Sequence, residues 1–416
     1  MSHLKMTKQE KSWVKYDVGN SAFVLLSTAL IPVYFSSIAT GSVVVAWGYA
    51  ETIASLIVAV LMPILGSLAD LRGNKKKFLI GFIGTGVVAC AALGFPTQAL
   101  PFLIIYVIAA VSLNSSMVFY DAFLVDATVE ARYDEVSSQG YAWGYIGSCV
   151  PFIVCLVVVL GGSVVGIDAV LGMKIAFVVT AVWWAAFSIP LVRDVHQAHF
   201  KERGTHLFKD TFLGLGRTCK SIFHDKRLFF FMLAFFFYID GVHTIIKMAT
   251  SYGTDLGIDS TQLVLALLVT QFVAFPSAIV YGRFATEVGT KKMLLISVFA
   301  YACITLFAAF FLRSALEFWI LAVCVGLFQG GIQALSRSEF GKLIPKEHAN
   351  EYFGFFDIFG KYAAVMGTAL VSIVTQLTGN PSVGVLSVGV LFIIGFVLLW
   401  KMPETISAEK TPSLLS

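Results

Sequence analysis

Charged residues are scarce in this chain. Asp, Glu, Lys and Arg make up 13% of its 416 residues, whereas 58% of the residues are hydrophobic. A water-soluble domain must cover itself with polar side chains, so this composition excludes an ordinary soluble globular fold. The mean hydropathy of +0.84 agrees with this conclusion. Lipid is therefore the expected solvent for most of the chain.

Signatures of several other protein classes are also missing. The six cysteines form no CxxC pair and most lie in apolar segments, which argues against a disulfide framework or a cysteine metal centre. No GxxxxGKS/T loop and no HExxH motif occur, so neither an ATP-driven pump nor a zinc protease is expected. We expect no enzymatic activity, no cofactor, no metal and no nucleic-acid partner. Residues 1–15 lack a short apolar core, so no cleavable signal peptide is expected.

What the sequence does have is twelve apolar segments, each near the ~20 residues that a transmembrane helix needs. They span residues 16–39, 43–69, 78–96, 100–125, 140–161, 170–192, 228–252, 261–282, 291–312, 316–338, 353–376 and 382–402. A longer polar stretch divides them six and six. We therefore predict an all-α membrane protein with an N-terminal bundle (1–192), a cytoplasmic linker containing an amphipathic helix (193–227) and a C-terminal bundle (228–416).

The distribution of basic residues predicts the orientation. Lys and Arg stay on the cytoplasmic side of short loops. All 29 of them except Lys174, Lys247 and Arg313 fall in one alternating set of loops and helix ends. We expect both termini in the cytoplasm, and an inner or plasma membrane location.

The two halves also repeat. Gly66, Ala69, Gly73 and the lysines after them follow the second segment, and Gly282 opens the same pattern of glycine, alanine, glycine and paired lysines after the eighth. A parallel repeat of six helices is one common transporter architecture, with a central binding site.

Ionisable residues inside the membrane are costly and indicate a cavity, a partner or a function. Asp240, His243 and Lys247 share one face of the seventh segment. One interpretation is a solute-binding site, with Lys247 binding a carboxylate and Asp240 and His243 as candidates for proton coupling. The alternative is a structural polar ladder with Lys247 reaching outward.

Other polar residues mark the first, fourth and tenth segments. Candidate solute ligands there are Asn20, Asn114, Asp121, Gln329 and Gln333. Each pair within one segment lies on a single helical stripe.

The loop after the second segment predicts a cytoplasmic latch that ties helix ends together when this side is closed. Its candidate members are Gly66, Asp70, Arg72, Gly73, Lys76 and, from the tenth segment, Arg337. Asp126 and Arg132 are candidate partners of the loop. The simpler alternative, which is compatible, is that the positive charges only set topology.

Residues 66–76 (GSLADLRGNKK) resemble the loop signature of the major facilitator superfamily. More narrowly, Trp13 with residues 16–23 (YDVGNSAF), and residues 329–338 (QGGIQALSRS), resemble the vacuole-effluxer-like branch. Residues 238–242 (YIDGV) and 351–356 (EYFGFF) agree. The resemblance implies two six-helix bundles that rock about a cavity lined by helices one, four, seven and ten. In one departure, Tyr120 is followed by Asp121 where the family usually has asparagine, and the added carboxylate can alter the solute or the coupling ion.

We therefore expect a secondary active transporter, working as a monomer in the lipid bilayer. It would move a small polar solute such as an amino acid, with a proton as a candidate coupling ion. The alternatives are a non-transporting receptor or scaffold on a transporter fold, and a transporter of sugars, osmolytes or drug-like solutes.

Overall fold

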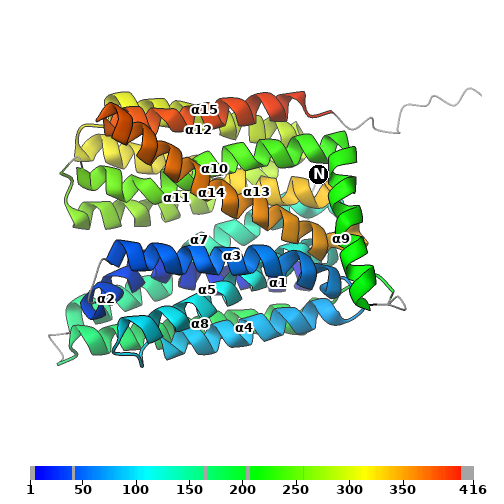
Figure 1. Ribbon diagram of the computed structural model, residues 1–416, viewed down its shortest axis with the longest axis horizontal. Coiled ribbons are helices and arrows are strands. Elements are labelled where there is room, and N and C mark those ends of the chain that lie inside the picture. The colour runs from blue at the N-terminus through cyan, green and yellow to red at the C-terminus, as the bar shows by residue number, and fades with distance from the viewer. Residues whose placement is uncertain (1–4, 40–42, 163–165, 203–206, 256, 404–416) are drawn as a thin grey trace, which may run out of the picture.

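The chain folds into a bundle of long helices (Figure 1). The computed structural model describes residues 5–39, 43–162, 166–202, 207–255 and 257–403. In the first part of the chain the α-helices are α1 (Lys8–Ala29), α2 (Ile31–Ile38), α3 (Val43–Ala69), α4 (Asn74–Ala92), α5 (Ala99–Ala122), α6 (Leu124–Ala127), α7 (Tyr133–Gly161) and α8 (Ala169–Asp194). In the second part they are α9 (Leu207–His224), α10 (Lys226–Asp255), α11 (Ser260–Val288), α12 (Thr290–Phe311), α13 (Ala315–Leu343), α14 (Ala349–Thr378) and α15 (Pro381–Lys401).

The all-helical membrane fold predicted from the sequence is confirmed. Among the described residues, ten helices are long and apolar enough to cross a membrane, and the pair α1 and α2 makes an eleventh span with a 43° bend. α4 is the remaining helix that the sequence predicts to cross the membrane, and three lysines in its first turn lower its apolar character. The prediction of twelve spans thus depends on counting α4.

The first helix begins earlier than the predicted residue 16. Thr7 and Glu10 form a capping box, in which each side chain accepts a hydrogen bond from the other residue's backbone N–H, so the helix starts at Lys8 in polar sequence. It breaks after Ala29 because Pro32 lies in the first turn of α2 and has no backbone N–H. Hydropathy alone cannot detect a polar helical extension.

The helices pack as two groups (Figure 1). In the first group, α1 packs on α7 and α8, and α4 packs between α5 and α8. In the second, α10 packs on α14 and α15, and α12 packs on α13 and α15. The main contacts between the groups are α3 with α14 and α7 with α11, and α13 also packs on α7.

Glycine lets these two pairs of helices approach closely. A Cβ on Gly66 of α3 would lie 2.5 Å from the backbone oxygen of Asn350 in α14. A Cβ on Gly282 of α11 would lie 2.6 Å from Cβ of Ser138 in α7. The repeated glycine of the sequence therefore occupies the same kind of position in both halves, at a crossing between the groups.

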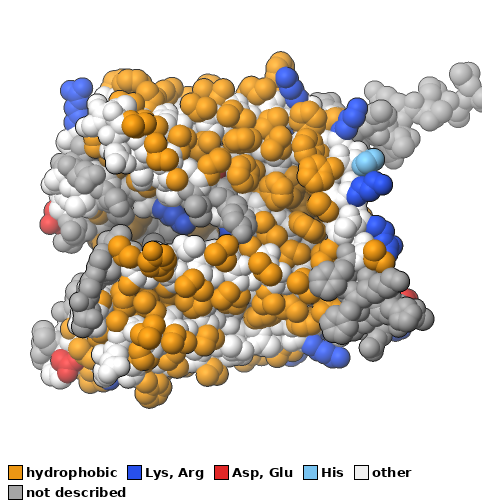
Figure 2. Space-filling view, viewed as in Figure 1, with side chains coloured by type: hydrophobic (Ala, Val, Ile, Leu, Met, Phe, Trp, Pro, Cys, Tyr) orange, Lys and Arg blue, Asp and Glu red, His pale blue; other side chains and the backbone are white. Residues whose placement is uncertain are grey.

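The two ends of the bundle differ. α9 runs across one end, from α3 to α10 and α14, and basic side chains gather there (Figures 1 and 2). We call this the basic end. At the opposite end Figure 2 shows a hollow between the two groups, with a basic side chain inside it. Hydrophobic side chains cover the flank between the two ends.

The predicted linker helix corresponds to α9. Thr218 and Ile222 are buried against the bundle, whereas Leu213, Arg217 and Phe223 are exposed. α9 therefore packs on the underside of the protein with one face and presents a mixed apolar and basic face outward.

The Gly66 crossing predicts a specific sensitivity. Replacing Gly66→Ala forces the backbones of α3 and α14 apart, and overpacking of this kind costs about 1–3 kcal/mol. We expect a clear drop in the thermal unfolding temperature of the purified protein. Gly81→Ala in α4, where a Cβ meets no neighbour within 4 Å, is the matched control and should change nothing. Equal effects of the two substitutions would contradict the proposed close crossing.

Candidate functional site

Arg337 joins the two groups in the interior of the bundle. It lies in α13 of the second group, is 1% exposed, and directs its guanidinium into the first group. Its Nη1 donates to Asp121 Oδ1 at 2.8 Å, and its Nη2 lies 3.4 Å from Asp17 Oδ2. Its Nε and Nη2 also donate to the hydroxyl and backbone oxygen of Ser137, both at 2.9 Å. Two carboxylates and a third helix of the first group therefore hold one buried cation.

Three aromatic rings complete this enclosure, which we call the Arg337 cage. The guanidinium carbon lies 4.4 Å from the ring centre of Tyr141, 4.7 Å from that of Trp13 and 5.3 Å from that of Tyr120. Tyr120 also donates its hydroxyl to Asp17 at 2.7 Å. Aromatic faces attract a desolvated cation, so the cage compensates a charge that is buried.

The cage includes one predicted latch residue and one predicted solute ligand. Arg337 was expected in the latch, and it makes contacts between the two groups; the latch role stays a prediction. Asp121 was expected to bind solute, yet it is occupied by Arg337 and remains 19% exposed. Asn20 is buried, and its amide donates to the Tyr16 backbone at 3.1 Å and to Asp17 at 3.3 Å. Asn20 therefore stabilises the cage through its hydrogen bond to Asp17.

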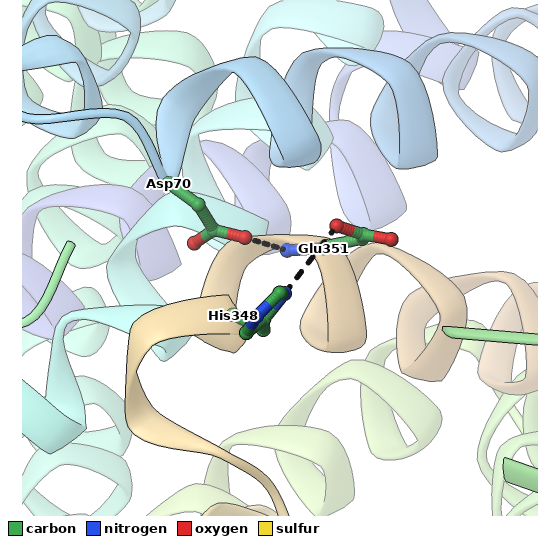
Figure 3. Close-up of side chains that lie close together, drawn as sticks. All are labelled: Asp70, His348 and Glu351. Carbon is green, nitrogen blue, oxygen red and sulfur yellow. Dashed lines mark hydrogen bonds and ion pairs between the residues drawn. The ribbon is translucent and has the colours of Figure 1, made fainter. Parts of the chain in front are cut away.

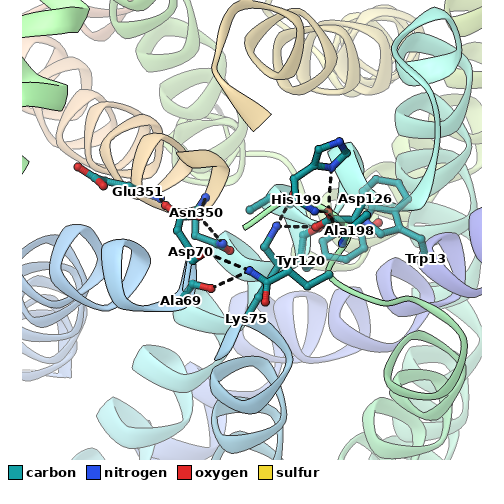
Figure 4. Close-up of polar contacts among 12 residues, drawn as sticks. Trp13, Ala69, Asp70, Lys75, Tyr120, Asp126, Ala198, His199, Asn350 and Glu351 are labelled. Atoms are coloured by element: carbon teal, nitrogen blue, oxygen red, sulfur yellow. Dashed lines mark hydrogen bonds and ion pairs between the residues drawn. The ribbon is translucent and has the colours of Figure 1, made fainter. Parts of the chain in front are cut away.

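Asp70, at the end of α3, caps a helix of the other group (Figure 4). Its Oδ1 accepts hydrogen bonds from the backbone and side-chain N–H groups of Asn350 at 2.9 and 2.7 Å, and its Oδ2 accepts from the Glu351 backbone at 3.1 Å. These amides belong to the first turn of α14, which has no side-chain cap of its own. Free N–H groups at a helix start attract a carboxylate.

Asp70 is 1% exposed, and its environment changes its acidity. Burial raises the pKa of Asp70 to about 6, although the charges of Lys201 and Lys75 and the hydrogen bonds from Asn350 act to lower it. The closed basic end therefore holds a carboxylate that titrates close to neutral pH.

A second set of contacts between the groups surrounds Asp134 at the start of α7. Its Oδ1 accepts from the Ser338 hydroxyl at 2.5 Å, and its Oδ2 lies 2.6 Å from Lys342 Nζ. Thr290, at the start of α12, donates to the same Oδ2 at 2.9 Å. This contact lies beside the Gly282 crossing, as Asp70 lies beside the Gly66 crossing.

The other predicted latch residues stay within the first group and its linker. Arg72 lies over the Phe200 ring at 5.1 Å. Gly73 has a φ of +76°, which favours glycine, and starts α4. Lys76 Nζ lies 2.8 Å from His196 Nδ1.

Nor do the two candidate partners of the loop reach the second group through their ion pairs. Asp126 pairs with Lys75 at 2.6 Å, and Arg132 pairs with Glu10 at 2.8 Å. Of the described loop residues, Asp70 makes the polar contacts with α14.

One trio at the basic end has donor atoms suited to a metal ion. Ligand atoms of Asp70, His348 and Glu351 lie within 4.8 Å of one another (Figure 3). However, the Lys201 ammonium lies 2.7 Å from Glu351 Oε2 and 3.9 Å from Asp70 Oδ2. Lys201 thus supplies a positive charge where a bound metal ion would supply one.

Asp240, His243 and Lys247, the ionisable residues in the apolar part of α10, do not share one environment. Asp240 is fully buried and accepts from the Gly367 backbone N–H of α14 at 2.8 Å, while its Oδ2 has no hydrogen-bond partner in the described part of the chain. His243 is half-buried against the Gly360 backbone. Lys247 is exposed and makes no ion pair with any described residue. Lys247 is therefore the most accessible of the three.

The remaining candidates line helix faces inside the bundle. Asn114 and Gln333 are half-buried, and the Asn114 amide donates to the Ala110 carbonyl at 2.8 Å. Gln329 is buried and lines a small pocket between α10, α11 and α13, together with Thr270 and Gln271.

α14 also carries an ion pair with the i, i+4 spacing of an ordinary structural pair. Asp357 and Lys361 pair with each other, and both are half-buried. They share a helical face with Asn350 and Gly354, which contact Asp70 and the Met62 backbone of the first group. The pair therefore lies on the face of α14 that packs against the first group. Its signal in the sequence is two charges inside a long apolar segment.

Comparison with known proteins identifies relatives along almost the full chain. Residues 27–410 match the model of a family described as "Vacuole effluxer Atg22 like". An MFS-type transporter of Bacillus subtilis (strain 168), YxiO, is 45% identical over 416 residues, covering 97% of each chain. Autophagy-related protein 22 of Cryptococcus neoformans is 28% identical over 64% of this chain and 50% of its own length. These relatives are transporters rather than enzymes, as the sequence predicts.

Solved structures show the same fold. The human organic anion transporter MFSD10 (TETRAN) aligns with a TM-score of 0.77 at 13% identity, covering 94% of this chain and 99% of its own. FucP, a major facilitator superfamily transporter in the outward conformation, aligns with a TM-score of 0.72 at 12% identity, covering 95% and 98%. From the family match and the Bacillus relative, we conclude that this chain belongs to the Atg22-like vacuole effluxer family of the major facilitator superfamily.

Proposed function

We propose that this protein is a secondary active transporter that moves a small polar solute, such as an amino acid, by alternating access. The observation that carries the proposal is the contrast between the two ends of the bundle. At the basic end a buried arginine and two helix crossings join the groups, while the opposite end is hollow (Figure 2). Rocking that separates the Arg337 cage would open the basic end and close the hollow one.

The basic end would face the cytoplasm, because short basic loops remain on that side of a membrane. Lys8, Lys77 and Lys226 lie at this end, at the starts of α1, α4 and α10. Both termini would then be cytoplasmic. An inner or plasma membrane is the location we propose, with the protein working as a monomer.

The solute would bind between the groups, above the Arg337 cage. Lys247 is free to bind an anionic group, and Asp121 and Asp357 face the same space from opposite groups. A solute with both a carboxylate and an ammonium group would find opposite charges there. The half-buried Asn114 and Gln333 would add hydrogen bonds.

Asp240 is the strongest candidate for coupling to protons. A buried carboxylate without a cationic partner is costly in hydrocarbon, so it favours the protonated form. The Asp240 Oδ2 without a hydrogen-bond partner is the atom that would carry the proton. His243, one turn away on the same helix, would serve as its neighbour in proton exchange.

Flux through proteoliposomes tests this function. With the purified protein and a panel of amino acids, sugars and osmolytes, we expect accumulation of one class of solute that increases with a pH gradient. Asp240→Asn should abolish gradient-driven accumulation and leave exchange intact, because the proton site is lost but the solute site remains. The control is Glu287→Gln, an exposed position in the last turn of α11. Unchanged accumulation by Asp240→Asn would refute coupling at this residue, and absence of flux across the panel would favour a receptor or scaffold.

Arg337→Gln should open the basic end. The substitution leaves Asp17 and Asp121 buried without their cation, and breaking a buried ion pair costs about 3–5 kcal/mol. Spin labels at Lys77→Cys and Lys226→Cys, exposed positions of opposite groups, report the separation in a background with serine at the native cysteines. We expect a longer distance for Arg337→Gln, a partial change for Arg337→Lys, and none for Arg313→Gln, which is exposed. An unchanged distance for Arg337→Gln would rule out the cage as the closing contact.

The acidity of Asp70 predicts a pH dependence of the same distance. The pKa of Asp70 is about 6 when buried in the closed state, whereas an aspartate in water titrates near ~4. The closed state therefore binds the proton more tightly. Its population should rise as the pH falls from about 6 to about 4, and this contribution is lost as the pH rises through 6.

The variant Asp70→Asn isolates this effect from the other groups that face Asp70. Lys201, Lys75, Glu351 and His348 surround it, and they remain in the variant. The pH-dependent shift between 6 and 4 should disappear with Asp70→Asn. A shift of the same size in the variant would assign the titration to another group.

A further inference from the structure

The segment that leaves α8, residues 195–202, is fastened to the turn after α3. We call it the strap. The Lys201 backbone N–H donates to the Asp70 carbonyl at 2.7 Å, and the Arg72 N–H donates to the Lys201 carbonyl at 3.3 Å. Gln197 adds side-chain bonds, accepting from the Gly73 N–H at 2.9 Å and donating to the Ala69 carbonyl at 3.2 Å. Lys201 of the strap and Leu71 of the turn therefore form an isolated parallel β-bridge.

A second anchor fixes the strap to the first group. The backbone N–H groups of Ala198 and His199 both donate to Asp126 Oδ1 at 2.9 Å (Figure 4). Asp126 Oδ2 pairs with the buried Lys75 at 2.6 Å. Although burial acts to raise it, the Lys75 charge and the hydrogen bonds from His199 lower the pKa of Asp126 below its usual value. Asp126 thus stays ionised and holds the strap at physiological pH.

Among the polar contacts of the strap's described residues, only that of the Lys201 side chain reaches the second group. Its Nζ lies 2.7 Å from Glu351 Oε2, and Glu351 is fully buried at the start of α14. The same Nζ lies 3.9 Å from Asp70 Oδ2. One ammonium therefore lies beside two buried carboxylates that belong to opposite groups.

We infer that Lys201 is a positioning residue of the transport cycle, which holds Asp70 and Glu351 together while the basic end is closed and releases Glu351 when it opens. The inference rests on the proposed alternating access. The cation that closes the α3–α14 crossing, Lys201, would then belong to the linker and to neither bundle.

The charges at this crossing support the inference. Without Lys201, two buried carboxylates would face each other, and like charges in a low dielectric repel strongly. His348 lies 3.8 Å from Glu351 Oε2 but is 41% exposed and is cationic only when protonated. A neutral imidazole carries no charge and cannot replace Lys201. The closed state would therefore depend on the strap.

The test is the distance between the labels at Lys77→Cys and Lys226→Cys, measured at pH 7.5 on the full-length protein. Lys201→Met should increase the ratio of open to closed basic ends by about tenfold, less than a fully buried pair would give because Lys201 is partly exposed. Lys201→Arg should stay near the wild-type ratio. Lys220→Met, at an exposed lysine of α9 in the same linker, is the matched control and should not change it.

A second variant separates charge positioning from general damage to the fold. Adding Glu351→Gln to Lys201→Met removes one of the two opposed carboxylates, so the double variant should return toward the wild-type ratio. A merely structural role would make the double variant worse than either single one. The inference is wrong if Lys201→Met leaves the ratio unchanged while Arg337→Gln increases it. If neither substitution increases the ratio, alternating access about this end fails as well.

Discussion

The closed arrangement of this protein depends on one buried positive charge. Taking a guanidinium out of water costs several kcal/mol even in real proteins, so it persists only where hydrogen bonds and opposite charges surround it. Arg337 comes from the second group, but Asp17, Asp121 and Ser137 all come from the first. The arginine is therefore satisfied only while the two groups are together. A contact with this property opposes separation until something else compensates the charges.

Elsewhere at the basic end, polar groups are also satisfied by partners from outside their own group. Asp70 satisfies the free N–H groups of a helix that belongs to the other group, and Lys201 satisfies the carboxylates that this brings together. The repeat within the chain explains the geometry. Gly66 and Gly282 lie at the two crossings, and equivalent buried hydrogen bonds join Tyr16 to Ser116 at 2.6 Å and Tyr238 to Ser336 at 2.7 Å. The two halves share a scaffold and differ in where the charges lie.

The sequence predicts the scaffold well, because lipid imposes long apolar helices and short basic loops. It also identifies Asp70 and Arg337, since charges at helix ends and in apolar segments are unusual there. It does not identify which charges meet. Asp121 was expected to bind solute, and its pairing with Arg337 could not be predicted because Arg337 is distant in sequence and belongs to the other group.

Other parts of the site escaped sequence analysis for related reasons. Lys201 lies in a polar linker, where one more lysine carries no signal, and its importance comes from a strap that local propensity does not predict. Asp357 and Lys361 have the spacing of an ordinary helical ion pair, and only the packing of α14 shows that they face the first group. Arg72 looked equivalent to Asp70 in the loop, yet the turn directs it onto Phe200.

An experimental structure of the protein with its basic end open tests the central claim most directly. The account predicts that Arg337 has left Asp17, Asp121 and the three aromatic rings, and that α3 and α14 have separated at Gly66. The two groups would each keep their internal packing. A structure in which α3 and α14 are apart while Arg337 remains inside its cage would contradict the account, because the buried charge would then not be what holds the end closed.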